Sequence, residues 1–145
     1  GGEYLLSNNK CYIWMHKEVD KNQELIDYKF FCFNGKVKCF KIDFDRFTNH
    51  QANYYDSKGD LLMFGETDCP PDFDRDIKIP DELPKMIELA EKLSSNHPFL
   101  RVDFYCVSGH IYFGELTFYP ASGFGEFVPP EWDIKLGTWI DLPQK

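Results

Sequence analysis

The residues with the clearest chemical potential lie on two neighbouring candidate strands within 99–118. In the first, Asp103 follows Arg101 at a spacing of two, and in the second Thr117 follows Glu115 at the same spacing. Successive side chains of a strand point to opposite faces, so each of these pairs shares one face. Hard divalent cations bind carboxylate oxygens, and Mg²⁺ commonly takes one or two protein carboxylates together with phosphate oxygens. These residue types therefore point to a cation site, and Arg101 places a positive charge on the same face.

The turn between the two strands decides whether the acidic side chains meet. A two-residue loop at Ser108-Gly109 would pair Asp103 with Gly114, whereas a three-residue loop would pair Asp103 with Glu115. Only the second register lets the apolar residues of both strands face one core. We therefore predict an odd-length loop or a β-bulge, with glycine supplying the positive φ. Opposed carboxylates repel by roughly 0.2–1 kcal/mol, a cost that a cation would remove. An ordinary solvated polar face fits the same pattern, so both interpretations stay open.

A hairpin and a helix are expected to support this pair. Two β-rich runs within 27–46 flank Asn34-Gly35, a strong hairpin signal, and Lys29 interrupts the aromatic residues of the first run. Lys29 stands out within this aromatic strand, and a surface lysine that extends to solvent is its simplest interpretation. Strict alternation in the second run would place Val37 on the face opposite Phe40. An apolar stripe over 83–93 predicts one helix, with Asp81 as its N-cap.

Two further candidates carry weaker signals. Asp43 and Asp45 form a DxD tripeptide, a pattern with which some nucleotide-sugar transferases hold a metal ion. The tripeptide is common by chance, and a solvated strand end explains it as well. His50 could serve as a ligand or an acid-base group because its reference pKa lies near 6.5, but a surface loop histidine is the simpler interpretation.

Composition limits the class of protein. The chain has 145 residues, enough for one domain with a real core, and 17% of them are aromatic, which favours a sheet-rich fold. A net charge of −8 argues against nucleic acid and anionic membranes as partners. No apolar run reaches the roughly 20 residues that span a bilayer. Five scattered cysteines without a CxxC pair, and no signal peptide, predict a reducing, cytoplasmic location.

Between Asp27 and Leu142 the chain resembles the TupA-like ATP-grasp proteins, a family linked to teichuronic acid and other surface polysaccharide synthesis. The resemblance rests on the following motifs taken together: DYKFFCFNGKVK at 27–38, DRFTNH at 45–50, MIELAEKL at 86–93, RVDFY at 101–105, GELTFYPASGF at 114–124 and EWDIKLG at 131–137. It implies an α+β fold, mostly an antiparallel sheet with one main packing helix, forming the C-terminal portion of an ATP-grasp fold. Residues 27–145 would be the ATP-grasp C-terminal subdomain, and 1–26 a hinge-like segment with a charged loop.

The resemblance also assigns roles to individual residues. It implies that Asp103 and Glu115 hold Mg²⁺ on the phosphates of ATP, and that Thr117 takes a third metal position where the family usually has asparagine. Arg101 and Lys29 match positions that contact phosphate or an acyl phosphate, so both are expected to bind the cofactor and to assist catalysis. Glu3 falls in a segment like the hinge that holds adenine and ribose.

The implied activity is phosphoryl transfer to a carboxylate, followed by attack of an amine or another nucleophile on the acyl phosphate. The expected partners are a nucleotide and a carboxylate-bearing or sugar substrate. The family's N-terminal half is missing from the sequence, so weak nucleotide binding without turnover is expected, and an exposed sheet surface would allow self-association. Two alternatives stay open: a glycosyltransferase of polysaccharide synthesis using Asp43 and Asp45, and a non-catalytic ATP-grasp-like module.

Overall fold

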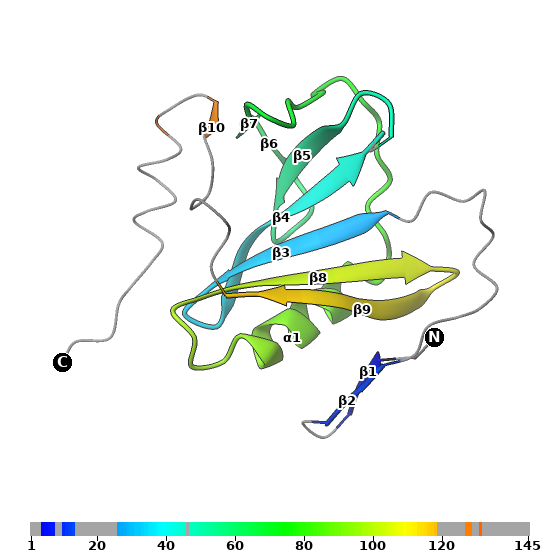
Figure 1. Ribbon diagram of the computed structural model, residues 1–145, viewed down its shortest axis with the longest axis vertical. Coiled ribbons are helices and arrows are strands. Elements are labelled where there is room, and N and C mark those ends of the chain that lie inside the picture. Colours follow the sequence, from blue (N-terminus) through cyan, green and yellow to red (C-terminus); the bar gives the residue numbers. More distant parts are fainter. Residues whose placement is uncertain are drawn as a thin grey trace.

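The central feature of the fold is a six-stranded antiparallel sheet with the order β6-β5-β4-β3-β8-β9. The computed structural model describes residues 26–45, 47–118 and 131, together with the backbone of 4–7, 10–13 and 127–128. The strands of the sheet are β3 (Asp27–Phe33), β4 (Lys36–Phe44), β5 (Gln51–Asp56), β6 (Leu61–Leu62), β8 (Phe99–Val107) and β9 (His110–Thr117). With one helix, α1 (Leu83–Leu93), packed on this sheet, the predicted α+β architecture is confirmed (Figure 1).

Two short antiparallel strand pairs lie outside the main sheet. β1 (Tyr4–Ser7) pairs with β2 (Lys10–Ile13), and β7 (Gly65–Glu66) pairs with β10 (Phe127–Val128), both antiparallel. In the part of the chain that the structure describes, no helix is long and apolar enough to cross a membrane.

The β3–β4 hairpin turns at Asn34-Gly35, as predicted. Both residues adopt positive φ, 53° and 78°, which is the conformation that a two-residue hairpin loop of this type requires. The expected face of Val37 was wrong, because the register shifts along this hairpin: Phe31 pairs with Cys39, but Cys32 pairs with Val37. Lys38 is the extra residue, so Val37 joins Phe40 in the same core cluster.

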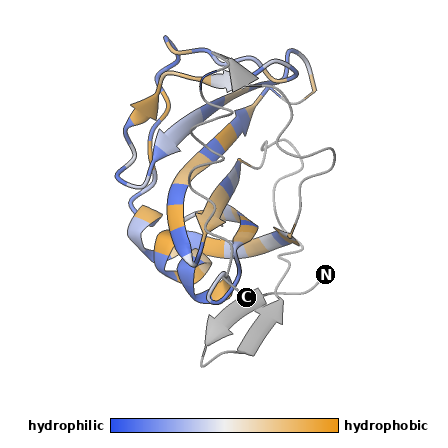
Figure 2. Cartoon of the chain, turned by 90° about the vertical axis from the view of Figure 1, so that its left-hand side faces the viewer, coloured by the Kyte–Doolittle hydropathy of each residue, from blue (hydrophilic) through white to orange (hydrophobic). Residues whose placement is uncertain are grey.

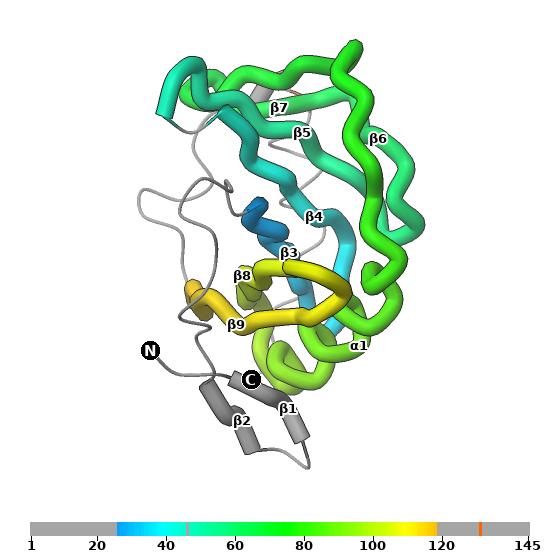
Figure 3. The backbone as a smooth tube through the Cα atoms, turned by 90° about the vertical axis from the view of Figure 1, so that its right-hand side faces the viewer, coloured from blue at the N-terminus to red at the C-terminus, as the bar shows by residue number. Residues whose placement is uncertain are grey.

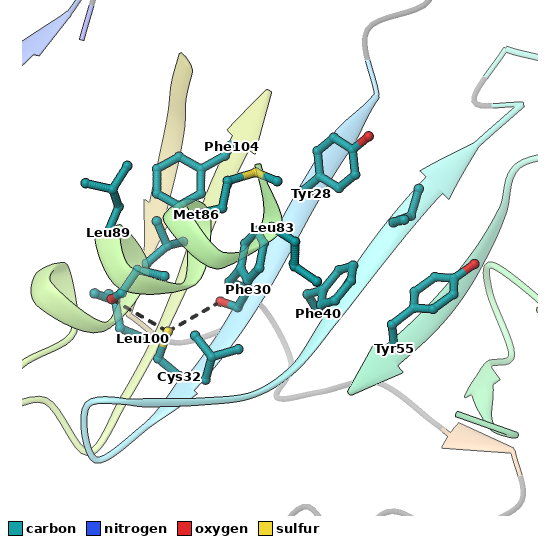
Figure 4. Packing of buried hydrophobic residues seen from close by; sticks show 14 residues of the cluster. Tyr28, Phe30, Cys32, Phe40, Tyr55, Leu83, Met86, Leu89, Leu100 and Phe104 are labelled. Atoms are coloured by element: carbon teal, nitrogen blue, oxygen red, sulfur yellow. Dashed lines mark hydrogen bonds between the residues drawn. The ribbon is translucent and has the colours of Figure 1, made fainter. Parts of the chain in front are cut away.

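Helix α1 covers one face of the sheet, against β3, β4 and β8 (Figure 3). The side chains that it buries are Leu83, Met86, Leu89 and Ala90. Figure 4 shows Met86 and Leu89 next to the Phe104 ring of β8, and Leu100 belongs to the same cluster. The expected N-cap was wrong: Glu82, not Asp81, takes this place, and no side chain caps the helix. A backbone bond from Leu83 N–H to the Pro80 carbonyl adds a turn before the helix, which moves its start by one residue.

The opposite face of the sheet carries a second, smaller aromatic cluster. Its buried members are Phe31, Phe33, Cys39, Tyr54, Phe64 and Phe99. Hydrophobic and hydrophilic residues alternate along the strands (Figure 2), but aromatic side chains occupy part of this second face as well. Lys29, Arg101 and Asp103 lie on the same face of the sheet, beside this cluster, and form what we call the charged face.

Candidate functional site

The register of β8 and β9 places the two candidate carboxylates directly opposite each other. Asp103 pairs with Glu115, and Arg101 pairs with Thr117. Val107 pairs with His110, so the loop has two residues, Ser108 at φ 51° and Gly109 at φ 78°. The three-residue loop was therefore wrong, and the alternative, a β-bulge, is confirmed: the register shifts between Asp103 and Phe104 and leaves one residue of β9 unpaired.

That extra residue is Gly114, and the space around it accepts no side chain. A Cβ at this position would lie 2.9 Å from the Tyr105 ring and 3.1 Å from the backbone oxygen of Asp103. Glycine thus lets the two strands approach closely at the bulge. Since a shift of one residue would turn Glu115 to the other face, Gly114 is the residue that brings the acidic pair together.

Asp103 is a buried carboxylate held by two cationic side chains. It is only 3% exposed. Arg101 donates from Nε to Oδ1 at 2.9 Å and from Nη2 to Oδ2 at 3.0 Å. Lys29, its cross-strand neighbour on β3, donates from Nζ to Oδ2 at 3.2 Å. The structure therefore brings together three of the residues singled out in the sequence, Lys29, Arg101 and Asp103.

Glu115 and Thr117 flank this group from the edge strand. Glu115 is exposed and Thr117 is partly buried. Because their strand partners are Asp103 and Arg101, both side chains lie on the same face as the buried group. At one end of the arrangement, Lys29 and Arg101 contact the buried carboxylate of Asp103. At the other end, the carboxylate of Glu115 and the hydroxyl of Thr117 lie towards solvent.

Lys29 lies among carboxylates from three strands. Besides Asp103, its ammonium group contacts Asp27 at 3.3 Å and Asp43 at 3.8 Å, and its side chain is 12% exposed. A buried ammonium ion is stable only with such compensation. Lys29 is therefore not a lysine that extends freely to solvent, and its charge is fixed beside the acidic pair.

The charged network continues across β4 and β5 to residues that the sequence analysis did not propose. Lys41, the strand partner of Lys29, contacts Asp43 at 3.4 Å and Glu66 at 3.1 Å. Tyr54 donates to Glu66 at 2.6 Å. Burial, followed by the charge of Glu66, raises the pKa of Tyr54 well above its ordinary value. Strand alternation could have placed Lys41 on this face, but Glu66 lies in a short strand within a loop region and gave no signal.

Asp43 and Asp45 do not form a joint site. Asp43 is buried among Lys29, Lys41 and His50, whereas Asp45 pairs with Arg75 at 2.6 Å. Asp45 also adopts a positive φ of 54°, outside β4, which breaks the strand alternation that would have aligned the two carboxylates. Glu3, the residue expected near adenine and ribose, lies outside the described residues.

The donor set determines which metal ion the site could hold. Among the described residues, no group of three or more His, Cys, Asp or Glu side chains is arranged to bind a metal ion. Two carboxylates on paired positions with a hydroxyl beside them remain. That set suits Mg²⁺, which binds few protein carboxylates and completes its octahedral shell with water and phosphate oxygens. It does not suit a structural zinc site, which needs a closed set of four ligands.

Comparison with known proteins gives one clear result. A family model described as TupA-like ATPgrasp matches residues 9–141, most of the chain. Neither the curated proteins nor the solved structures contain a significant match. The match includes all described strands of the central sheet and every candidate residue except Glu3.

Proposed function

The chain belongs to the TupA-like ATP-grasp family, and from this premise we propose that the charged face around Asp103 binds the phosphates of Mg-ATP. The observation that carries the proposal is the pairing of Asp103 with Glu115, beside Arg101 and Lys29 on one face. Binding of a nucleoside triphosphate needs cationic side chains for the phosphates and carboxylates that can hold Mg²⁺, and this face offers both. Residues 27–145 would form the phosphate-binding subdomain, and 1–26 the hinge-like segment.

Each side chain would have a distinct role. Asp103, Glu115 and the hydroxyl of Thr117 would hold Mg²⁺, which when bound supplies positive charge to the phosphate oxygens. Arg101 presents a planar guanidinium that suits phosphate as well as the carboxylate it contacts here. Lys29 supplies a fixed ammonium charge close to Asp103. Because these cations are already held in place, little reorganisation is needed when negative charge develops on the transferring group.

The reaction we propose is phosphoryl transfer to a carboxylate, giving an acyl phosphate that a nucleophile then attacks, as part of surface polysaccharide synthesis. The protein groups contribute by positioning and by electrostatic stabilisation, which supply most of the catalysis in phosphoryl transfer. Lys29 and Arg101 are the groups that would contact the transferred phosphoryl oxygens. A carboxylate-bearing substrate, sugar or otherwise, would have to lie next to them.

Thermal unfolding with and without Mg-ATP tests this proposal. A ligand at about 100 times its dissociation constant adds roughly 2.7 kcal/mol of stability, which for a domain of this size is a shift of roughly 5–11 °C. Glu115→Gln should abolish the shift, and because Glu115 is exposed the variant should remain folded. Asp103→Ala should abolish it too.

Asp45→Ala is the matched control, since Asp45 is an aspartate with one close cationic partner away from the acidic pair. This variant should keep the full Mg-ATP shift. A shift that survives Glu115→Gln and is lost in Asp45→Ala would overturn the proposal and favour the DxD alternative. No shift in the parent chain at millimolar Mg-ATP would contradict nucleotide binding by this face.

A further inference from the structure

Three side chains beside the charged face form a hydrogen-bonded chain that the nucleotide site does not use. The Sγ atom of Cys69 lies 3.4 Å from Nδ1 of His50. On the other side of the imidazole ring, Nε2 lies 3.1 Å from Oδ1 of Asp43. Asp43 comes from β4, His50 directly precedes β5, and Cys69 follows β7 in a loop. Three separate segments therefore meet as thiol, imidazole and carboxylate.

The carboxylate determines which nitrogen of His50 carries the proton. An ionised aspartate can only accept hydrogen bonds, so Nε2 must donate to Asp43. In the neutral ring, Nδ1 is then left as an acceptor directed at the thiol. Asp43 is buried and also contacts Lys41 at 3.4 Å, so its carboxylate is held in place and fixes the orientation of the imidazole ring. The arrangement has the order that nucleophilic catalysis requires: nucleophile, base and a group that orients the base.

The thiol is reachable and holds its proton. Cys69 and His50 are both partly exposed. Burial, the largest cause, raises the pKa of Cys69, and the negative charges of Glu66, Asp43 and Asp68 raise it further, against the opposing effect of Lys41. A thiol that stays protonated near neutral pH is a weak nucleophile without a base. His50 Nδ1 lies within hydrogen-bond reach to remove that proton as the sulfur attacks.

We propose that Cys69 is a nucleophile for activated acyl groups, with His50 as its general base and Asp43 as the positioning residue. The sulfur forms a bond to the carbonyl carbon, the bond from that carbon to the leaving oxygen breaks, and the leaving group departs as an alcohol or as phosphate. The thiol proton passes to His50 and from there to the leaving group. The product is a thioester on Cys69, which water or an amine cleaves to regenerate the thiol.

This site lies next to the charged face, because Asp43 contacts both His50 and Lys29. An acyl phosphate formed at that face would thus be generated near Cys69. The thiol chemistry does not depend on nucleotide binding, however, and its test contains neither nucleotide nor Mg²⁺. Failure of one proposal therefore leaves the other unaffected.

The test is acylation of the folded chain by two probes, p-nitrophenyl acetate and acetyl phosphate, followed by intact mass and peptide mapping in acid. We expect one acetyl group on Cys69 as a thioester, formed at least tenfold faster than on Cys106. Cys106 is a matched internal control: it is also partly exposed, but its thiol donates to a carboxylate of Glu82 at 3.5 Å instead of an imidazole. Reaction with acetyl phosphate would identify acyl phosphates as the acyl source, and reaction with the ester alone would identify esters.

Variants separate the chemical role from a structural one. His50→Gln should lower acylation of Cys69 about 100-fold, the usual contribution of a general base, and leave Cys106 unchanged. Asp43→Asn should lower the acylation rate of Cys69 relative to that of Cys106, whereas mere loosening of the fold would raise both rates. Cys69→Ser should remove the labelled peptide. Equal rates at Cys69 and Cys106, or an unchanged rate at Cys69 in His50→Gln, would overturn the proposal.

Discussion

Replacing Lys29 with methionine tests whether the charged face is held together by a buried cation. Methionine keeps the length of the side chain but removes the ammonium group that lies within 4 Å of three carboxylates. Removing one partner of a buried ion pair costs roughly 3–5 kcal/mol, because the remaining charge is left uncompensated. Asp103 keeps Arg101 and Asp43 keeps Lys41, so we expect a loss of about 3 kcal/mol, at the lower end of that range.

The assay is thermal and urea unfolding of the parent chain and two lysine variants. For a domain of this size a loss of about 3 kcal/mol lowers the midpoint by roughly 6–12 °C. Lys92→Met is the matched control, because Lys92 contacts Glu88 at a similar distance, 3.3 Å, but its side chain is 65% exposed. Solvent screens such a pair, so the midpoint of this variant should hardly move. Equal shifts in the two variants would refute the idea that burial makes the Lys29 network important.

Three further outcomes are expected. Gly114→Ala should destabilise the chain by about 1–3 kcal/mol and weaken Mg-ATP stabilisation, since the added Cβ would lie 2.9 Å from the Tyr105 ring; unchanged unfolding and binding would contradict this. Asn53→Ala should speed proteolysis of 67–80, because the buried amide bonds both backbone groups of Asp72 at 2.8 and 2.9 Å; an unchanged cleavage rate would argue against that anchor. Burial raises the pKa of Cys32 from 9.0 to about 12, so the folded chain keeps a proton that the unfolded chain loses. Stability should therefore fall as the pH rises from about 9 towards 12, and Cys32→Ala should flatten that fall in urea titrations.

The sequence pattern predicted the features that depend on neighbouring residues. The Asn34-Gly35 hairpin and the pairing of Asp103 with Glu115 follow from alternation and turn chemistry, and helix α1 follows from its apolar stripe. The apolar residues selected the register, and the structure satisfied it through a bulge at Gly114 rather than through a longer loop. Sequence alone could not choose between those two solutions, because both restore the same parity.

The contacts of residues from loops and very short strands could not be predicted. Glu66, His50 and Cys69 reach the charged face from segments that have no periodic pattern, so their neighbours depend on tertiary packing. Val37 was placed on the wrong face for a related reason: the bulge at Lys38 changes the alternation within β4, and no proline or glycine marks it. Contacts such as Cys69 with His50 therefore become visible only in three dimensions.

The order of the strands in the sheet has a consequence for how the chain folds. β3 and β8 lie side by side, yet Lys29 and Asp103 are 74 positions apart in the sequence. Closing so long a loop costs chain entropy before any contact repays it, and such non-local pairing slows folding. Each flanking hairpin can form early from neighbouring residues, but the charged face exists only after the two hairpins have joined along the β3–β8 seam. A phosphate ligand can therefore bind there only once β3 and β8 have paired, and it would slow separation of the two halves of the sheet.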